Sequence, residues 1–258
     1  MVNNRLKLNG DKTHLMLLGT DKAWRSKLTG DSLKLSTDPD MDMIKTSSCE
    51  KVLGCIVSQN LKWADHILLN EKSLVRQLTT RLSALKSISA SANFKTRLMF
   101  ANGIFLSKLA YAMPVWGGCE EYLVRSLQIV QNKAARLVCR KGIYTPISTL
   151  LGECNWLSVS QLIVYHSLVL LHKVQKCHEP KYLYGLFTRE RRYNIRGEGL
   201  GKMDCTSVNL PTLNLNCRSF KWRTVQQWNQ LPASVRQCKS LMEFKAKLKT
   251  WIRENIAI

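Results

Sequence analysis

Residues 120–141 read EEYLVRSLQIVQNKAARLVCRK, and the spacing of their side chains predicts one long amphipathic helix. The apolar residues recur at alternating intervals of four and three, which places them on one face of a helix. They are Leu123, Leu127, Val130, Ala134 and Leu137. The other sides are polar and basic, and they carry Arg125, Gln128, Asn132, Lys133, Arg136, Arg140 and Lys141. The stretch therefore predicts a helix with one face in a core and a positively charged outer surface.

Two further helices are predicted directly upstream. Helical spacing begins at Asp65, and one apolar stripe runs through Leu74, Leu78, Leu82, Leu85 and Ile88. Basic residues lie off that stripe, namely Lys72, Arg76 and Lys86. A second helix is expected over residues 93–112. It should stop near Met113-Pro114, because a residue that precedes proline disfavours the helical backbone.

Downstream, the segment 158–177 is apolar on most sides, which indicates a helix in the centre of the core. Its two histidines, His166 and His172, are expected to be packed or hydrogen-bonded rather than to bind a metal. Residues 188–217 show little periodicity and are expected to be irregular.

The C-terminus predicts two more helices, one over residues 219–229 and one that opens with the capping box Ser240-Leu241-Met242-Glu243. The last helix is expected to turn apolar side chains inward, namely Leu241, Phe244, Leu248, Trp251 and Ile252. Its outer side would carry Lys245, Lys249 and Arg253.

The first 60 residues alternate short apolar runs with turn residues, which predicts strands. Three strands of a small sheet are expected, at residues 14–18, 32–35 and 51–57. The chain is therefore predicted to be an α+β protein, mostly α-helical. Its expected parts are an N-terminal β segment at 1–64, a helical bundle at 65–145 and a basic helical domain at 146–258.

The net charge of +21 is unevenly distributed. Residues 1–60 carry a net charge of +2, against +9 for residues 61–180 and +10 for residues 181–258. Because the basic residues are spread over several helices, nucleic acid is the expected partner, ahead of an anionic membrane surface. A merely solvated basic surface is the remaining alternative.

Nine cysteines form an odd set, and no apolar N-terminal stretch with a cleavage site precedes them. Reduced thiols in a cytoplasmic or nuclear protein, not a secreted one, are therefore expected. The two longest apolar stretches, 98–116 and 162–174, are interrupted by polar and charged residues, so no membrane span is expected.

The search for a self-contained active site yields no catalytic residue, cofactor site or metal site. The densest acidic group, Asp38-Pro39-Asp40-Met41-Asp42, is expected to be an exposed turn rather than a two-metal site. Cys177-His178 with Cys205 and Cys217 lacks the second close pair that a zinc site needs. There is no Gly-x-Ser-x-Gly elbow and no glycine-rich phosphate loop.

Several short phrases nonetheless follow one another in a specific order. They are LKLNGDKT (6–13), VLG (52–54), LKW (61–63), His66-Ile67, YAMPVWG (111–117), LQ (127–128), QNKA (131–134) with Arg136, and WNQLP (228–232). In this order they resemble the C-terminal part of reverse transcriptases encoded by non-LTR retrotransposons of the LINE-like, jockey- or RTE-like kind. The resemblance covers nearly the whole chain. It implies a palm remnant with its primer-grip hairpin, a helical thumb and a helical C-terminal domain.

The resemblance also implies residue roles. Lys12 would match the late palm lysine that approaches the incoming nucleotide's phosphates, although a plain surface lysine fits the residues equally well. Leu53, Gly54 and Trp63 would belong to the primer grip, which holds the primer's 3′ end. The alternative is that the apolar residues of this hairpin simply form its core, namely Val52, Leu53, Ile56 and Val57. Nucleic-acid contacts are expected from Arg76, Arg125, Asn132, Lys133, Arg136, Arg140, Lys141, Lys245 and Lys249.

The chain departs from the family at the catalytic centre. The paired aspartates of the family's Tyr-x-Asp-Asp turn would lie upstream of Leu6, so the Mg²⁺ ions of the full-length enzyme would lack protein ligands here. This chain alone is therefore expected to have no polymerase activity.

Three functions are compatible with these observations. The first is a reverse-transcriptase fragment that binds RNA, DNA or their hybrid. The second is a shortened reading frame of an active full-length RNA-directed DNA polymerase, which the coding sequence upstream of Met1 would reveal. The third is a helical scaffold that binds another protein. The oligomeric state and the template are left open.

Overall fold

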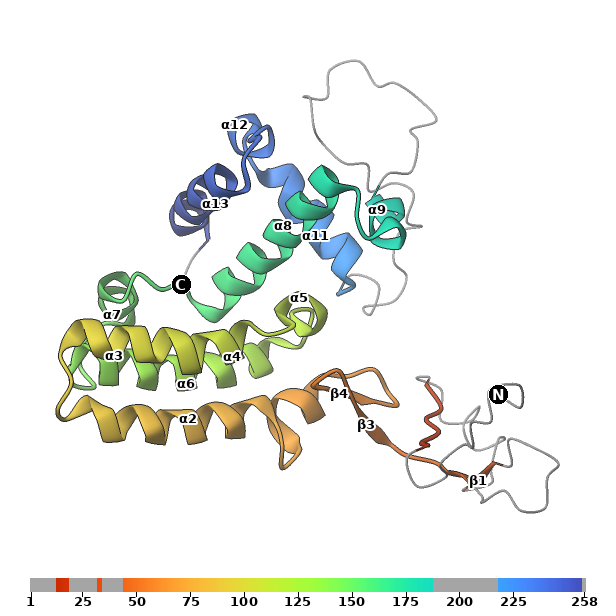
Figure 1. The fold of residues 1–258 in the computed structure, drawn as a ribbon, viewed down its shortest axis with the longest axis horizontal. Helices are drawn as coiled ribbons and strands as arrows, with labels where there is room; N and C mark the ends of the chain where they lie inside the picture. The colour runs from red at the N-terminus through yellow and green to blue at the C-terminus, as the bar shows by residue number, and fades with distance from the viewer. Residues whose placement is uncertain (1–12, 19–31, 34–43, 188–217, 257–258) are drawn as a thin grey trace, which may run out of the picture. The chain divides into compact units, whose positions relative to one another are not determined.

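The computed structural model describes residues 13–18, 32–33, 44–187 and 218–256. These residues are mostly helical, with two short antiparallel strand pairs, so the predicted α+β, mostly α-helical class is confirmed (Figure 1). The chain divides into two compact units, Met1–Arg76 and Gln77–Ile258. Within the described ranges, no helix is long and apolar enough to cross a membrane.

The first unit contains a tight β-hairpin. Strand β3 (Cys49–Val52) pairs antiparallel with β4 (Cys55–Ser58), in a register that sets Val52 opposite Cys55. Leu53 and Gly54 connect the strands, and both have left-handed backbones, with φ of 47° and 85°. Two-residue turns of this kind suit hairpins because their twist matches that of the strands. The predicted single strand at 51–57 is therefore wrong, because the chain reverses in its middle.

The other two predicted strands have different outcomes. Strand β1 (Ser32–Leu33) pairs with β2 (Ile44–Lys45). The first two residues of the strand predicted at 32–35 are thus confirmed, and the other two lie outside the described residues. The strand predicted at 14–18 is wrong, because these residues contribute a single bridge, between Leu15 and Thr46.

A π-helical turn, η3 (Asp65–Leu69), packs against β4. His66 of this turn is buried, and its Nδ1 accepts a hydrogen bond from the main-chain N–H of Ile56 at 3.2 Å. Ile56 is buried as well, whereas Val52 and Leu53 are 52% and 88% exposed. The alternative that the apolar residues of the hairpin form its core is therefore wrong for Val52 and Leu53, because both lie at the exposed end of the hairpin.

Residues 94–110 form one helical run, within the predicted range of 93–112. It comprises α3 (Phe94–Ala101), the π-helical turn η4 (Asn102–Leu106) and α4 (Ser107–Ala110). The run ends where Ala112 adopts a left-handed backbone, with φ of 51°. A short helix, α5 (Met113–Trp116), follows with Pro114 in its first turn, where a missing N–H costs nothing. The stop near Met113 is confirmed, but Pro114 begins a helix and does not end one.

The two long amphipathic helices are also confirmed. Helix α2 (Leu74–Ser89) buries Leu74, Leu78, Leu82 and Leu85. Helix α6 (Glu121–Cys139) buries Leu123, Leu127, Val130 and Ala134. The last member of each predicted stripe, Ile88 and Leu137, is only half-buried. In α6 the 3.6-residue period brings Val138 into the core in place of Leu137.

Helix α8 (Val159–Cys177) is the central helix of the second unit, as predicted for residues 158–177 (Figure 1). Ser158 and Gln161 form a reciprocal capping box at its start. Helices α11 (Phe220–Gln230) and α13 (Leu241–Asn255) pack along it. Besides α5, three short helices of the described residues are absent from the sequence-based predictions, namely α7 (Ile147–Glu153), α9 (Lys181–Phe187) and α12 (Ala233–Arg236).

The histidines of α8 are packed, as expected. The His172 ring is buried, stacks on Phe244 with 4.1 Å between ring centroids and donates from Nε2 to the Cys238 carbonyl oxygen at 3.1 Å. The His166 ring meets the Tyr165 ring edge-on at 5.4 Å. Burial lowers the pKa of both histidines. Both rings are therefore neutral near pH 7.

The last helix starts at Ser240, whose hydroxyl accepts a hydrogen bond from the Met242 N–H at 3.3 Å. Glu243 pairs with Lys247 at 2.8 Å, so the helix start is confirmed but the reciprocal capping box is wrong. The predicted inward face is confirmed, with Phe244, Leu248 and Ile252 fully buried and Leu241 and Trp251 half-buried. Residues 188–217, predicted to be irregular, lie outside the described residues.

Candidate nucleic-acid interface

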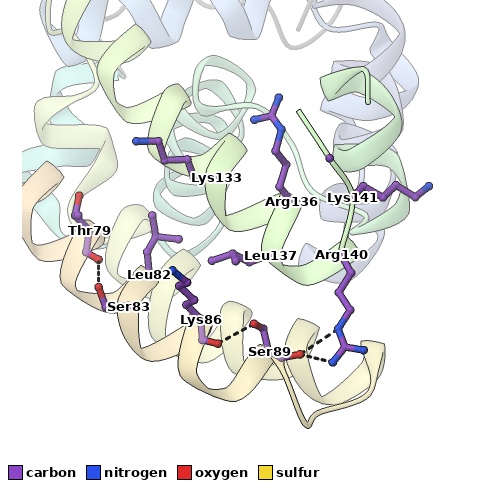
Figure 2. Close-up of a pocket in the computed structure, with 11 residues that line it drawn as sticks. Thr79, Leu82, Ser83, Lys86, Ser89, Lys133, Arg136, Leu137, Arg140 and Lys141 are labelled. Carbon is purple, nitrogen blue, oxygen red and sulfur yellow. Dashed lines mark hydrogen bonds between the residues drawn. The ribbon is translucent and has the colours of Figure 1, made fainter. Parts of the chain in front are cut away.

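A groove lies between α2 and the C-terminal half of α6, within the second unit (Figure 2). Its volume is about 650 Å³, and it is lined by Thr79, Leu82, Ser83, Lys86, Ser89, Lys133, Arg136, Leu137, Arg140, Lys141 and Gly142. Five of these eleven residues are lysine or arginine, and none is aspartate or glutamate. Positive charge is therefore concentrated in the groove, on a protein that is already strongly basic.

The lining follows one spacing on both helices. On α2 the residues Thr79, Leu82, Ser83 and Lys86 occupy positions i, i+3, i+4 and i+7, and Lys133, Arg136, Leu137 and Arg140 do the same from α6. Residues at this spacing share one face of a helix. Each face has a leucine near its middle, and Leu82 is buried while Leu137 is half-buried. Lys86 at the end of the α2 face and Lys133 at the start of the α6 face are exposed. A mostly polar face of α2, with one lysine, therefore meets a basic face of α6 across the groove.

Arg140 ties the two helices together. It ends α6 with a left-handed backbone at φ 53°, and its side chain reaches back to the end of α2. Its Nε donates to the Ser89 carbonyl oxygen at 3.1 Å, and its Nη2 donates to the Ala90 carbonyl oxygen at 2.7 Å. A cation at a helix C-terminus is favourable because the last carbonyl groups carry partial negative charge. Arg140 therefore positions the groove as well as lining it.

The other four cations have different environments. Lys86 and Lys133 are exposed and make no ion pair among the described residues. Arg136 is half-buried, and its Nε is buried without a hydrogen-bond partner in the described part of the chain. Lys141 pairs with Glu153, and that hydrogen bond raises the pKa of Lys141. The Arg136 Nη2 also donates to the Ile143 carbonyl oxygen at 3.5 Å. Lys86 and Lys133 thus have the most unused capacity for an anion.

The groove brings together four of the predicted nucleic-acid-binding residues, namely Lys133, Arg136, Arg140 and Lys141. The other predicted residues lie elsewhere. Arg125 pairs with Glu121 of the same helix at 2.5 Å, and the Asn132 Oδ1 accepts from the Gln128 Nε2 at 2.7 Å. Arg76 is exposed on α2. Lys12 lies outside the described residues.

The lysines of α13 are less accessible than predicted. The Lys249 Nζ donates to the Asn155 carbonyl oxygen at 2.9 Å, and Arg253 donates to the side chain of the same residue. Burial lowers the pKa of Lys249. Lys245 is half-buried. The predicted outer face of α13 is therefore wrong for Lys249, which holds the helix to the loop before α8.

The primer-grip residues lie on the hairpin and beside it. Leu53 and Gly54 form its exposed turn, and Trp63 is half-buried with its ring edge-on to His66 at 6.1 Å. A bulky apolar residue with positive φ and 88% exposure is uncommon, since it stabilises neither the backbone nor a core. Leu53 is therefore a residue whose identity folding alone does not explain.

The sequence-based prediction did not include the four polar or charged residues that α2 contributes to the groove, namely Thr79, Ser83, Lys86 and Ser89. Their signal was available, because Thr79, Ser83 and Lys86 share the i, i+4, i+7 spacing that the α6 residues show. Among the described residues, no group of three or more His, Cys, Asp or Glu side chains is placed to hold a metal ion. Comparison with family models, curated proteins and solved structures found no match to this chain.

Proposed function

We propose that the groove between α2 and α6 binds the phosphate backbone of nucleic acid. We further propose that the chain is the C-terminal part of a non-LTR retrotransposon reverse transcriptase, with the hairpin at 49–58 as primer grip and α2 to α6 as thumb. The observation that carries the proposal is the convergence of five cations on one groove whose lining has no acidic side chain. Lys86 comes from α2, Lys133 and Arg136 come from α6, and Arg140 and Lys141 directly follow α6. The proposed family rests on the order of the short sequence phrases, from LKLNGDKT at 6–13 to WNQLP at 228–232.

The chemistry of the lining favours backbone contact over base recognition. Lysine ammonium groups act as point charges toward phosphate, and an arginine such as Arg136 can donate two parallel hydrogen bonds to it. The lining contains no aromatic side chain on which a base could stack and no asparagine or glutamine to read a base edge. Contacts of this kind position a nucleic acid without specifying its sequence.

Binding of the purified chain to a fluorescent RNA–DNA hybrid tests the proposal. Each neutralised phosphate releases counterion, so the logarithm of the binding constant should fall steeply with the logarithm of salt concentration. Duplexes of unrelated sequence should bind about equally. A binding constant that does not change with salt, or a preference for one sequence, would contradict backbone binding in the groove.

The enzyme class is a separate proposal. If the chain belongs to a longer polymerase, the coding sequence upstream of Met1 should continue in frame and encode Tyr-x-Asp-Asp. The groove would then hold the template–primer duplex while carboxylates of the upstream part bind the metal ions.

A further inference from the structure

Two cysteine thiols meet at the junction of α6 and α7. Cys139 is the last residue of α6, and Cys154 directly follows α7. Their Sγ atoms lie 3.4 Å apart, in hydrogen-bond contact. Both are free thiols. Two cysteines that are 15 positions apart along the chain, with a helix between them, are thus brought side by side by the packing of α7 on α6.

The two thiols differ in access. Cys139 is half-buried, whereas Cys154 is only 2% exposed, so Cys139 is the more accessible residue of the pair. The neighbouring polar groups are the Leu150 carbonyl oxygen, 3.9 Å from the Cys139 Sγ, and the Lys141–Glu153 ion pair. One sulfur is therefore placed to meet an oxidant and the other to resolve the product.

We propose that Cys139 and Cys154 form a reversible disulfide, a redox modification site at the rim of the basic groove. The S–S bond of a disulfide is about 2.05 Å long, so the sulfur atoms need to approach by roughly 1.4 Å more. A shift of this size is within reach, because Cys139 ends its helix and Cys154 lies just beyond the end of its own.

The oxidant is hydrogen peroxide, and the reaction has two steps. The Cys139 sulfur attacks one peroxide oxygen, so that an S–O bond forms, the O–O bond breaks and the departing hydroxide takes the thiol proton as water. The Cys154 sulfur then attacks the Cys139 sulfur, so that the S–S bond forms and the S–O bond breaks, and a second water leaves. The two sulfurs together lose two electrons, and the peroxide gains two.

The surroundings make the pair slow to oxidise. Burial raises the pKa of both thiols. Their mutual hydrogen bond lowers the pKa of Cys139 and raises that of Cys154. Glu153 raises both values further, while Lys141 lowers that of Cys139. Because the thiolate is the attacking species, few molecules react at neutral pH and more react as the pH rises.

The disulfide would act on the groove through the segment between the two cysteines. Arg140, Lys141 and Gly142, which line the groove, follow Cys139 directly. Cys154 follows Glu153, the partner of Lys141. Oxidation would thus fix both ends of the segment between the two cysteines, which carries Arg140 and Lys141, two of the five cations of the groove. The modification site itself does not depend on what the groove binds.

Mass spectrometry of the full chain tests the proposal directly. The chain is reduced, freed of reductant, treated with hydrogen peroxide and digested without reduction. A peptide linking Cys139 to Cys154, lighter by two hydrogens than the separate peptides, is expected. The melting temperature of the oxidised chain should rise by about 5–10 °C, because the bond closes a loop of about 15 residues. Dithiothreitol should reverse both changes.

Matched variants provide the controls. Cys139→Ser should abolish the linked peptide and the rise in melting temperature, whereas Cys177→Ser, at an exposed cysteine that ends α8, should retain both. Circular dichroism of the reduced variants checks that each is folded. A wild-type chain in which Cys139 is overoxidised, or linked to any other cysteine including Cys205 or Cys217, would overturn the proposal. The same melting rise in Cys139→Ser would overturn it too.

Discussion

The guanidinium group of Arg140 donates to the main-chain carbonyl oxygen of Ser89, so the residue that ends α6 also closes the end of α2. The two residues are 51 positions apart in the sequence. The bond fixes the ends of the two helices whose facing sides form the groove. One side chain thereby connects the stability of the second unit to the geometry of its candidate site.

Replacement of Arg140 by alanine should destabilise the second unit. Loss of the bonds to Ser89 and Ala90 leaves the last carbonyl groups of α2 to water and removes a cation from a helix C-terminus. A decrease of about 1–2 kcal/mol in the free energy of unfolding is expected, measured by urea denaturation. Arg125→Ala is the matched control, because its exposed pair with Glu121 should contribute less than about 1 kcal/mol. An equal decrease in the free energy of unfolding of the two variants would contradict the proposed stabilising role of the Arg140 hydrogen bonds.

Replacement of Leu53 by asparagine should stabilise the hairpin. Asparagine adopts a left-handed backbone more readily than leucine, and Asn-Gly is the preferred two-residue hairpin turn. Because Leu53 is 88% exposed, its removal should cost little packing. A gain of about 0.5–1 kcal/mol is expected, read from slower amide hydrogen exchange in β3 and β4.

The same variant separates stability from function at the hairpin tip. If Leu53 contacts a primer, Leu53→Asn should weaken hybrid binding while it stabilises the hairpin. Gly54→Ala is the structural control, since alanine is strained at φ 85° and should destabilise the turn. Faster amide exchange in Leu53→Asn would show that residue 53 does not have a left-handed backbone.

The buried His172 makes the second unit sensitive to acid. Burial holds the pKa of His172 below its ordinary value of 6.5, so the unfolded chain binds the proton more readily than the folded chain does. The free energy of unfolding should therefore be constant above about pH 6.5 and fall as the pH decreases below that value. Lys176 disfavours the charged ring as well, while the Cys238 carbonyl group acts in the opposite direction. Burial also lowers the pKa of His166, so protonation of this residue should decrease the free energy of unfolding as well.

His172→Gln tests this assignment. Glutamine can still donate to the Cys238 carbonyl oxygen but does not titrate. Urea unfolding at pH 7.5 and at pH 5.5 should show a smaller decrease in the variant than in the parent chain. A variant with an unchanged pH dependence would exclude His172 as its source.

The sequence predicted the elements that depend on local periodicity. The apolar stripes of α2 and α6 and the start of α8 at Ser158 are local features, and each appeared in the structure. The alternation of residues alone predicted one strand at 51–57, because Leu53 is not a residue that favours a turn. A hairpin at this place was expected only from the family resemblance.

The candidate site was only partly predictable, for a different reason. Lys133 and Arg136 were identified from the charge pattern of α6 alone, but their meeting with Lys86 depends on how α2 packs. Arg140 looked like one more surface cation, although its role is to bond carbonyl groups far away in the sequence. Lys249 likewise gave no signal of its contact with Asn155. Tertiary contacts of this kind cannot be recognised from the spacing of residues in the sequence.

Lys86 and Lys133 are the residues with which to test the groove, because neither carries a structural contact of the kind that Arg140 makes. The double variant Lys86→Gln/Lys133→Gln removes one cation from each side of the groove. Lys173→Gln/Lys239→Gln, at two exposed lysines of the second unit outside the groove lining, removes the same charge. Circular dichroism and melting temperature should be unchanged in both.

The most direct measurement is the salt dependence of hybrid binding by these two double variants and the parent chain. Because the groove variant neutralises two fewer phosphates, its slope of the logarithm of the binding constant against the logarithm of salt concentration should become shallower by about 1.8. The control variant should keep the parent slope. If both variants changed the slope equally, or neither did, binding would reflect overall charge, and the groove would not be the nucleic-acid interface.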